Sequence, residues 1–270
     1  MYNNIFDSHC HYDDEWFDED RYSLVESLPG KGVCGVVTNG TDLENVKTVL
    51  ELCSKYDFVY GTVGIHPECL ENLQENYLDK VAEISENKKI VAIGEIGLDY
   101  HWDIPKDKQT EVVKSQLKLA NDLNMPVVFH DREAHGDSME LLRKYKPKGL
   151  LHCYSGSTEM LKEVLKLGMY ISLGGVVTFK NARVPVEVAK AVPVDRLLLE
   201  TDAPYLAPVP CRGKRNDSSY ISYIAEKIAE IKNMDTQELI NITTENAKRM
   251  YGIKEGMNSG KTHLYIQKKL

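Results

Sequence analysis

Histidines and carboxylates recur in this sequence where short apolar runs end, and these residue types bind divalent metal ions. His9 and His11 are two residues apart, so in a strand both imidazoles would point to one side and Cys10 to the other. This spacing predicts a two-histidine metal clamp, with Asp7 on the same side to orient one imidazole. Taken alone, the H-x-H pattern is also typical of a polar loop start.

Glu95 lies in an apolar, glycine-flanked segment, where an unpaired carboxylate would be costly to bury. It therefore needs a cation nearby, either a pair of bridged metal ions or a Lys or Arg from a neighbouring strand. His130 and His152 each follow an apolar run, and Asp202 follows another just before a proline turn. One such histidine is often a hydrogen-bonded core residue, but two on consecutive strands favour metal ligation.

Together these side chains form a donor set that suits Mg²⁺, Mn²⁺ or Zn²⁺, and we expect two divalent ions. Two ions ~3.5–4 Å apart lower the pKa of water and stabilise the attacking and leaving oxygens of a displacement. Glu95 is expected to bridge them. The expected ligands are His9, His11, Glu95, His130, His152 and Asp202. Phosphodiester cleavage is a natural use of such a centre.

A basic run follows the last of the apolar runs, with Arg212, Lys214 and Arg215 within four residues. Phosphate often binds near the last two strands of a barrel, so we expect these cations to bind substrate. A solvated surface is the alternative reading. The acidic run over residues 13–20 is expected to be a solvated helix start that repels DNA from its sector.

The elements that must position these residues are short β-branched runs alternating with amphipathic stretches. Strands are expected at Asn4–His9, Val33–Asn39, Val59–His66, Ile90–Gly94, Pro126–His130, Gly149–His152, Met169–Leu173 and Arg196–Thr201. Helices are expected at Leu43–Lys55, Gln109–Leu123, Ala134–Lys144, Ser157–Leu167, Ser219–Lys232 and Gln237–Tyr251. Parallel strands need helical crossovers, so the pattern predicts a single (β/α)₈ TIM-type barrel over residues 1–270.

A doubly wound sheet is the alternative fold, but the first strand leads into Asp7–His11 and not into a G-x-G-x-x-G turn. In a barrel the carboxyl ends of the strands converge, which would bring the metal-binding candidates together. The remaining histidines, His101, His135 and His263, are expected in loops or the tail as solvated residues. No dinucleotide is expected.

Composition excludes several classes of protein. The 270 residues are 42% hydrophobic and 27% charged, which is typical of a globular chain. The net charge of −8 argues against a broad nucleic-acid-binding surface, although a local basic cluster or bound metals can attract phosphate. No run reaches the ~18 apolar residues of a membrane span, and six cysteines without a C-x-x-C pair fit a reducing, cytoplasmic location.

Motifs spread along nearly the whole chain closely resemble the TatD family of metal-dependent deoxyribonucleases, within the amidohydrolase-like barrels. The matching segments, in family order, are Asp7–His11, Gly64–Pro67, Gly94–Asp99, His130–Ala134, His152–Gly156, Glu200–Pro204 and Arg212–Asn216. Tyr12 and Tyr154 depart from the usual Leu or Ile and Phe without removing a ligand. The resemblance implies the six metal ligands above and a 3′-to-5′ exonuclease or related DNA-processing activity, with His66 touching substrate instead of metal.

The sequence is therefore interpreted as a two-metal enzyme that hydrolyses DNA phosphodiesters from single-stranded or frayed 3′ ends. Asp202 would ligate metal and accept the proton of the attacking water, so Glu95 and Asp202 are the expected catalytic residues. No membrane and no obligate protein partner are expected. A hydrolase of small amides, esters or phosphate esters is the alternative on the same barrel, and a metal-free binding protein is a third. A small neutral substrate has no use for the basic run.

Overall fold

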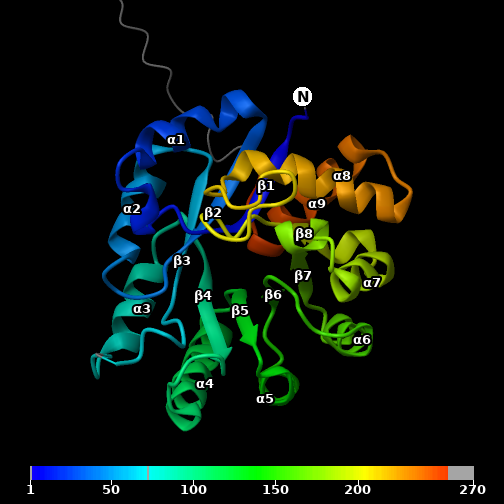
Figure 1. Cartoon of the computed structure of the whole chain (residues 1–270). Helices are drawn as coiled ribbons and strands as arrows, with labels where there is room; N and C mark the ends of the chain where they lie inside the picture. The colour runs from blue at the N-terminus through cyan, green and yellow to red at the C-terminus, as the bar shows by residue number, and fades with distance from the viewer. Residues whose placement is uncertain (1, 72, 255–270) are drawn as a thin grey trace, which may run out of the picture.

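Eight parallel strands form one sheet in the order of the sequence, wrapped into a barrel with helices outside it (Figure 1). The structure is a computed structural model that describes residues 2–71 and 73–254. The strands are β1 (Ile5–Cys10), β2 (Val33–Asn39), β3 (Val59–Val63), β4 (Ile90–Asp99), β5 (Val127–Arg132), β6 (Gly149–Leu151), β7 (Tyr170–Leu173) and β8 (Leu197–Leu199). The predicted (β/α)₈ barrel is confirmed.

Helices cross over between successive strands, as parallel pairing requires. They are α1 (Arg21–Ser27), α2 (Val46–Lys55), α3 (Tyr77–Ser85), α4 (Lys106–Asp122), α5 (His135–Tyr145), α6 (Thr158–Lys166), α7 (Arg183–Ala191), α8 (Ile221–Lys232) and α9 (Thr236–Tyr251). Sequence patterns predicted six of these. The short helices α1, α3 and α7 were not predicted, although Pro185 is well suited to the first turn of α7.

The two ends of the sheet meet where β1 faces the segment that follows β8. The hydroxyl of Ser8 donates to the Leu199 carbonyl at 2.8 Å, and the amide of Asp202 donates to the His9 carbonyl at 3.0 Å. The amide of His11 donates to the Ala203 carbonyl at 2.7 Å. These bonds bring Asp202 beside the two histidines, although about 190 residues of chain separate them.

Side chains alternate between the interior of the barrel and the layer beneath the helices. Seven strands contribute buried residues to an inner cluster, two of them from β4, and α9 takes part in it through Met250 and Tyr251. The strand residues of that cluster are Phe6, Val37, Val91 with Ala92, Val128, Leu150, Tyr170 and Leu198. The Tyr251 hydroxyl donates to the Ser8 carbonyl at 2.7 Å. The interior is therefore filled up to the level of the carboxyl ends, where polar residues begin.

Strand boundaries differ from the predicted ones where the metal-binding candidates lie. β4 continues to Asp99, five residues beyond the predicted end, while β3 ends at Val63 and β8 at Leu199. His66 and Asp202 consequently lie in the segments after their strands and not on them. Apolar content locates a buried strand, but the end of pairing depends on the neighbouring strand, and β4 pairs with β5 as far as Arg132.

In residues 2–71 and 73–254, no helix has both the length and the apolar character needed to span a membrane. All six cysteines are unpaired thiols, as their spacing predicted. His263 and the end of the predicted domain lie outside the described residues.

Candidate metal centre

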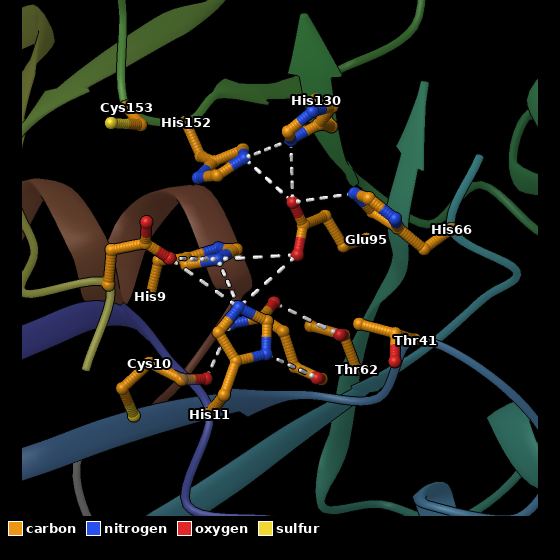
Figure 2. Close-up of polar contacts among 12 residues, drawn as sticks. His9, Cys10, His11, Thr41, Thr62, His66, Glu95, His130, His152 and Cys153 are labelled. Atoms are coloured by element: carbon orange, nitrogen blue, oxygen red, sulfur yellow. Dashed lines mark hydrogen bonds and ion pairs between the residues drawn. The ribbon is translucent and has the colours of Figure 1, made fainter. Parts of the chain in front are cut away.

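Seven metal-binding side chains converge at the carboxyl end of the barrel, and Figure 2 shows most of them facing Glu95. His9, Glu95 and His130 lie on β1, β4 and β5. The other four follow strands directly or within a few residues; they are His11, His66, His152 and Asp202. The predicted alternation in β1 is confirmed, because His9 and His11 face the centre while Cys10 packs in the core beneath the helices.

One group of donors contains His9, His11, Glu95 and Asp202. The Nε2 atoms of His9 and His11 are 3.1 Å apart, and each lies 3.4 Å from Glu95 Oε2 and 3.5 Å from Asp202 Oδ1. Atoms that each lie about 2.1 Å from a tetrahedral ion are ~3.4 Å from one another. The four side chains therefore have the spacing of ligands around one divalent ion.

A second group faces the other oxygen of Glu95. Glu95 Oε1 lies 2.8 Å from His130 Nδ1, 2.8 Å from His152 Nε2 and 3.4 Å from His66 Nε2. His130 and His152 are themselves 3.0 Å apart at these nitrogens. The sequence interpretation assigned His66 to substrate, but its nitrogen lies among the donors around Glu95, within reach of a shared ion (Figure 2).

Glu95 is 3% exposed, and every ion pair that it forms in the described parts of the chain is with a histidine. A Lys or Arg partner, the alternative left open by the sequence, is thus not what neutralises it. A carboxylate buried among imidazoles and presenting one oxygen to each group has the position of a bridging ligand.

The electrostatics of the centre favour positive charge. Burial would raise the pKa of Glu95, but the surrounding histidines, His152 first, hold it well below its usual value. Burial lowers the pKa of His11, yet Asp202 and Glu95 raise it to about 9 overall. His130 is likewise raised to about 10, against burial, by Asp99 and Glu95. The carboxylates hold cationic partners in place, and divalent ions would meet the same demand.

Further contacts orient the imidazoles from behind. His130 Nε2 lies 2.9 Å from Asp99 Oδ2, and His11 Nδ1 lies 3.0 Å from the Asn39 carbonyl, so the opposite nitrogen of each ring faces the centre. Sequence reasoning missed both contacts, although Asp99 stands four residues after Glu95 on the same strand.

Asp7 does not have the role predicted for it. Its carboxylate accepts from the backbone of Thr201 at 3.0 Å, from the Ser218 hydroxyl at 2.7 Å and from the backbone of His9 at 3.3 Å, not from an imidazole. Burial raises its pKa to about 6. Asp7 therefore joins β1 to the segments after β8 and supports His9 through the main chain.

The donor set fits divalent metal ions on these observations. Imidazole nitrogens and carboxylate oxygens are ligands for Zn²⁺ and Mn²⁺, and three groups of three donors each lie within 4.8 Å. The residues of these groups are His9, His152 and Asp202; His9, His11 and Glu95; and His66, Glu95 and His130. All six predicted ligands belong to them, together with His66.

A pocket of about 870 Å³ opens onto these donors, and seven of its twenty described lining residues are acidic. Asp13, Asp14 and Glu15, which the sequence suggested as a solvated helix start, line one side of it. Arg132, at the end of β5, is the sole Lys or Arg among the described lining residues. Sequence reasoning overlooked Arg132, even though it follows His130 by two positions.

The predicted basic run does not line this pocket. Arg215 makes two bonds of 2.8 and 2.6 Å to the carboxylate of Asp20, and Arg212 lies over the Phe179 ring at 3.8 Å from its centroid. Lys214 is exposed. Arg215 is thus paired with the acidic run that follows β1, and its predicted contact with substrate stays a prediction.

The two histidines outside the centre that the structure describes are partly exposed, as predicted, but each has a carboxylate neighbour. His101 Nδ1 lies 3.3 Å from Glu133 and His135 Nδ1 lies 2.7 Å from Asp131.

Comparison with known proteins agrees with this geometry. The model of a family described as TatD related DNase matches residues 6–252. The metal-dependent hydrolase YabD of Bacillus subtilis is 44% identical over 253 residues, which cover 92% of this chain and 99% of that relative. The 3′-5′ ssDNA/RNA exonuclease TatD of Citrobacter koseri is 31% identical over 258 residues, with the same coverage.

Among solved structures, a TatD homologue from Escherichia coli superimposes with a TM-score of 0.88 at 29% sequence identity. The match covers 94% of this chain and all of that one. The similarity thus extends over the entire barrel and includes every segment that contributes to the centre.

Proposed function

The chain belongs to the TatD-related DNase family of metal-dependent hydrolases, and we propose that it removes nucleotides from the 3′ ends of single-stranded or frayed DNA. The convergence of five histidines and two carboxylates beside an open pocket carries this proposal. Such a centre suits hydrolysis of a phosphodiester, because that reaction needs both an activated water and neutralisation of phosphate charge.

Two divalent ions are proposed, one held by His9, His11 and Asp202 and the other by His130, His152 and His66, with Glu95 shared. When bound, the ions supply Lewis acidity and lower the pKa of water. Glu95 keeps its negative charge because the surrounding imidazoles hold its pKa well below the usual value. It is thus a ligand over the whole physiological range of pH.

Asp202 is proposed to accept the proton of the attacking water. Its side chain is 17% exposed, more than that of Glu95 at 4%, so a water in the pocket reaches its carboxylate. His11 and His9 lower its pKa against burial, which keeps the carboxylate ionised.

Substrate phosphates are proposed to meet Arg132 within the pocket, because its guanidinium is the available cation among the described lining residues. Arg212 and Lys214 remain proposed contacts for phosphates further along the strand, since both are exposed. Arg215 is held by Asp20 and is proposed to act on substrate only through the position of its loop.

A panel of substrates tests the proposal. Purified protein is loaded with Mg²⁺, Mn²⁺ or Zn²⁺ and given 3′-labelled single-stranded DNA, the matching duplex, RNA of the same sequence and p-nitrophenyl esters. We expect the single strand to be cut fastest with at least one of these metals. Faster hydrolysis of the small esters than of any polynucleotide would instead support the small-molecule alternative.

A further inference from the structure

Exposed aromatic rings border the pocket that opens onto the donors. Six large apolar side chains are exposed in the described parts of the chain, and three of them are aromatic: Trp16 at 56%, Trp102 at 48% and Tyr205 at 44%. Trp102 and Tyr205 line the pocket, and the Trp16 ring lies 6.0 Å from that of Tyr205. The aromatic members of the exposed set are therefore gathered at one place.

The rings on the β1 and β8 side are held firmly. The Tyr205 hydroxyl donates to Asp14 Oδ2 at 2.6 Å, and the amide of Trp16 donates to Asp14 Oδ1 at 2.8 Å. Arg215 donates to the Trp16 carbonyl at 2.7 Å while its two bonds to Asp20 fix the guanidinium. Asp14 and Arg215 thus hold Trp16 and Tyr205 in place, and these two rings form an aromatic wall of the pocket mouth.

Trp102 stands on a separate segment, between β4 and α4. Its carbonyl accepts from the amide of Ile104 at 2.8 Å, and Gln109 on α4 donates to the Ile104 carbonyl at 3.1 Å. The indole meets the His101 ring edge-on, with 5.1 Å between centroids. Both walls are consequently anchored, while all three rings remain exposed.

The charges that line the pocket favour different positions for the phosphate and the base of a nucleotide. Asp13, Asp14 and Glu15 lie on the same wall as Tyr205 and repel a phosphate, whereas an uncharged base can approach there. Arg132 offers the pocket its cation at the end of β5. A nucleotide at the metal centre would therefore place its base, and not its phosphate, against the acidic aromatic wall.

We propose that Trp102 and the Tyr205–Trp16 pair stack on unpaired bases at the pocket mouth and thereby select single-stranded nucleic acid. Every base presents a π face, so stacking tolerates sequence, but bases inside a duplex are already stacked and cannot insert. This inference rests on the proposed nuclease function and adds the residues that set its preference for unpaired ends.

Tryptophan fluorescence offers a direct test, because Trp16 and Trp102 are both of the tryptophans in the chain. The metal-loaded protein is titrated with an oligodeoxyadenylate of eight nucleotides whose phosphorothioate linkages resist hydrolysis. We expect binding to quench the emission, and Trp16→Phe and Trp102→Phe each to remove part of that quenching. An abasic strand of equal length and a blunt duplex should quench little.

Binding of the variants separates stacking from backbone contact. Trp102→Ala or Tyr205→Ala should weaken binding of the oligodeoxyadenylate by about 10-fold and that of the abasic strand by less than about 2-fold. Leu123→Ala is a matched control, since this leucine is 41% exposed but lies at the end of α4 that leads into β5, away from the pocket. It should bind like the unaltered chain.

Several results would overturn the inference: no quenching, equal quenching by the abasic strand, or equal losses of affinity for both strands. An assay of 3′-labelled DNA cleavage with the same preparation distinguishes failure of the stacking inference from failure of the proposed nuclease function. If DNA is cut without base-dependent quenching, stacking is wrong and the nuclease stands. If base-dependent quenching occurs without cleavage, stacking is supported and the nuclease proposal fails.

Discussion

Glu95 presents its two carboxylate oxygens to different groups of donors, and this arrangement distinguishes it from the other ligands. Oε2 faces His9 and His11, while Oε1 faces His130 and His152. A residue shared between two ions should matter more for metal content than any ligand of a single ion.

Glu95→Gln should therefore lower both metal content and activity. The amide keeps the shape of the side chain but loses the charge that two ions would share, so we expect activity to fall by at least about 10³-fold. Metal analysis of the purified variant should find fewer ions than in the unaltered protein. His135→Ala, outside the centre, is the control and should retain both. Full metal content in Glu95→Gln would rule out the bridging role.

His66→Ala distinguishes a ligand from a substrate contact. Its Nε2 lies 3.4 Å from Glu95 Oε1, among the donors of the second group, so we expect metal content to fall by up to one ion. The sequence interpretation predicts the other result, a raised KM with metal content unchanged. Metal analysis alongside steady-state kinetics decides between the two.

Metal affinity should rise with pH. In the metal-free chain the pKa of His11 is raised to about 9 and that of His130 to about 10, so both carry protons at pH 7. Each proton must leave before its nitrogen binds an ion, and competition weakens as pH increases toward 9. Calorimetric titration with Mn²⁺ should show proton release and a Kd that falls by up to about tenfold per pH unit for each proton released. A Kd constant from pH 6 to 9 would contradict this.

At the scale of single residues, the sequence predicted the side chains that the structure brings together around Glu95, because a polar residue at the end of an apolar run is unusual and easily recognised. It did not predict which side chains would touch. Asp7 was expected to contact an imidazole, but the Thr201 and Ser218 hydroxyls, distant in sequence, provide better partners. Arg215 was expected to bind substrate, and its pairing with Asp20, 195 residues away, was not foreseen. Contacts of that kind depend on tertiary placement, which spacing does not encode.

At the scale of elements, β4 does most to position the centre. It carries Glu95 and Asp99 four residues apart, one as ligand and the other against the far side of His130. Gly97 lies between them with φ of +155°, and a Cβ there would come within 1.9 Å of the His130 carbonyl oxygen. Glycine is needed so that β4 and β5 can approach at this point.

Gly97→Ala should disturb both fold and site. The methyl group would collide with the β5 backbone in a conformation that alanine disfavours, so we expect the free energy of unfolding to drop by about 2 kcal/mol. Urea denaturation measures this loss, and metal content should fall as His130 moves. Gly30→Ala is the matched control, because nothing lies within 4 Å of a Cβ at that position. Equal stability of the two variants would show that β4 adapts without cost.

Element order was predictable because apolar runs and amphipathic stretches alternate so regularly. The ends of the strands were less predictable than their order. β4 continues through Gly94 and Gly97, although glycine usually signals the end of a strand. In β4 these two glycines allow the backbones of neighbouring strands to approach closely, and they do not reverse the chain. Asp235 caps the start of α9, because its side chain accepts from the amide of Glu238 at 2.9 Å.

Charge is distributed unevenly over the whole molecule, and that distribution matters more than the net value of −8. The acidic run after β1 lies at the pocket and pairs in part with the basic run after β8, through Asp20 and Arg215. What remains at the pocket is Arg132, aromatic rings and the carboxylates that hold cations. Recognition of nucleic acid would then depend on bound metal and on unpaired bases more than on a basic surface.

The direction of DNA cleavage tests the central claim most directly. Metal-loaded protein is incubated with 5′-labelled single-stranded DNA, and the products are resolved by length over time. We predict a ladder that shortens one nucleotide at a time from the 3′ end, stops on addition of a chelator and is absent with Glu95→Gln. Intact DNA under conditions in which a small phosphodiester is hydrolysed, or cleavage that survives both treatments, would contradict the account.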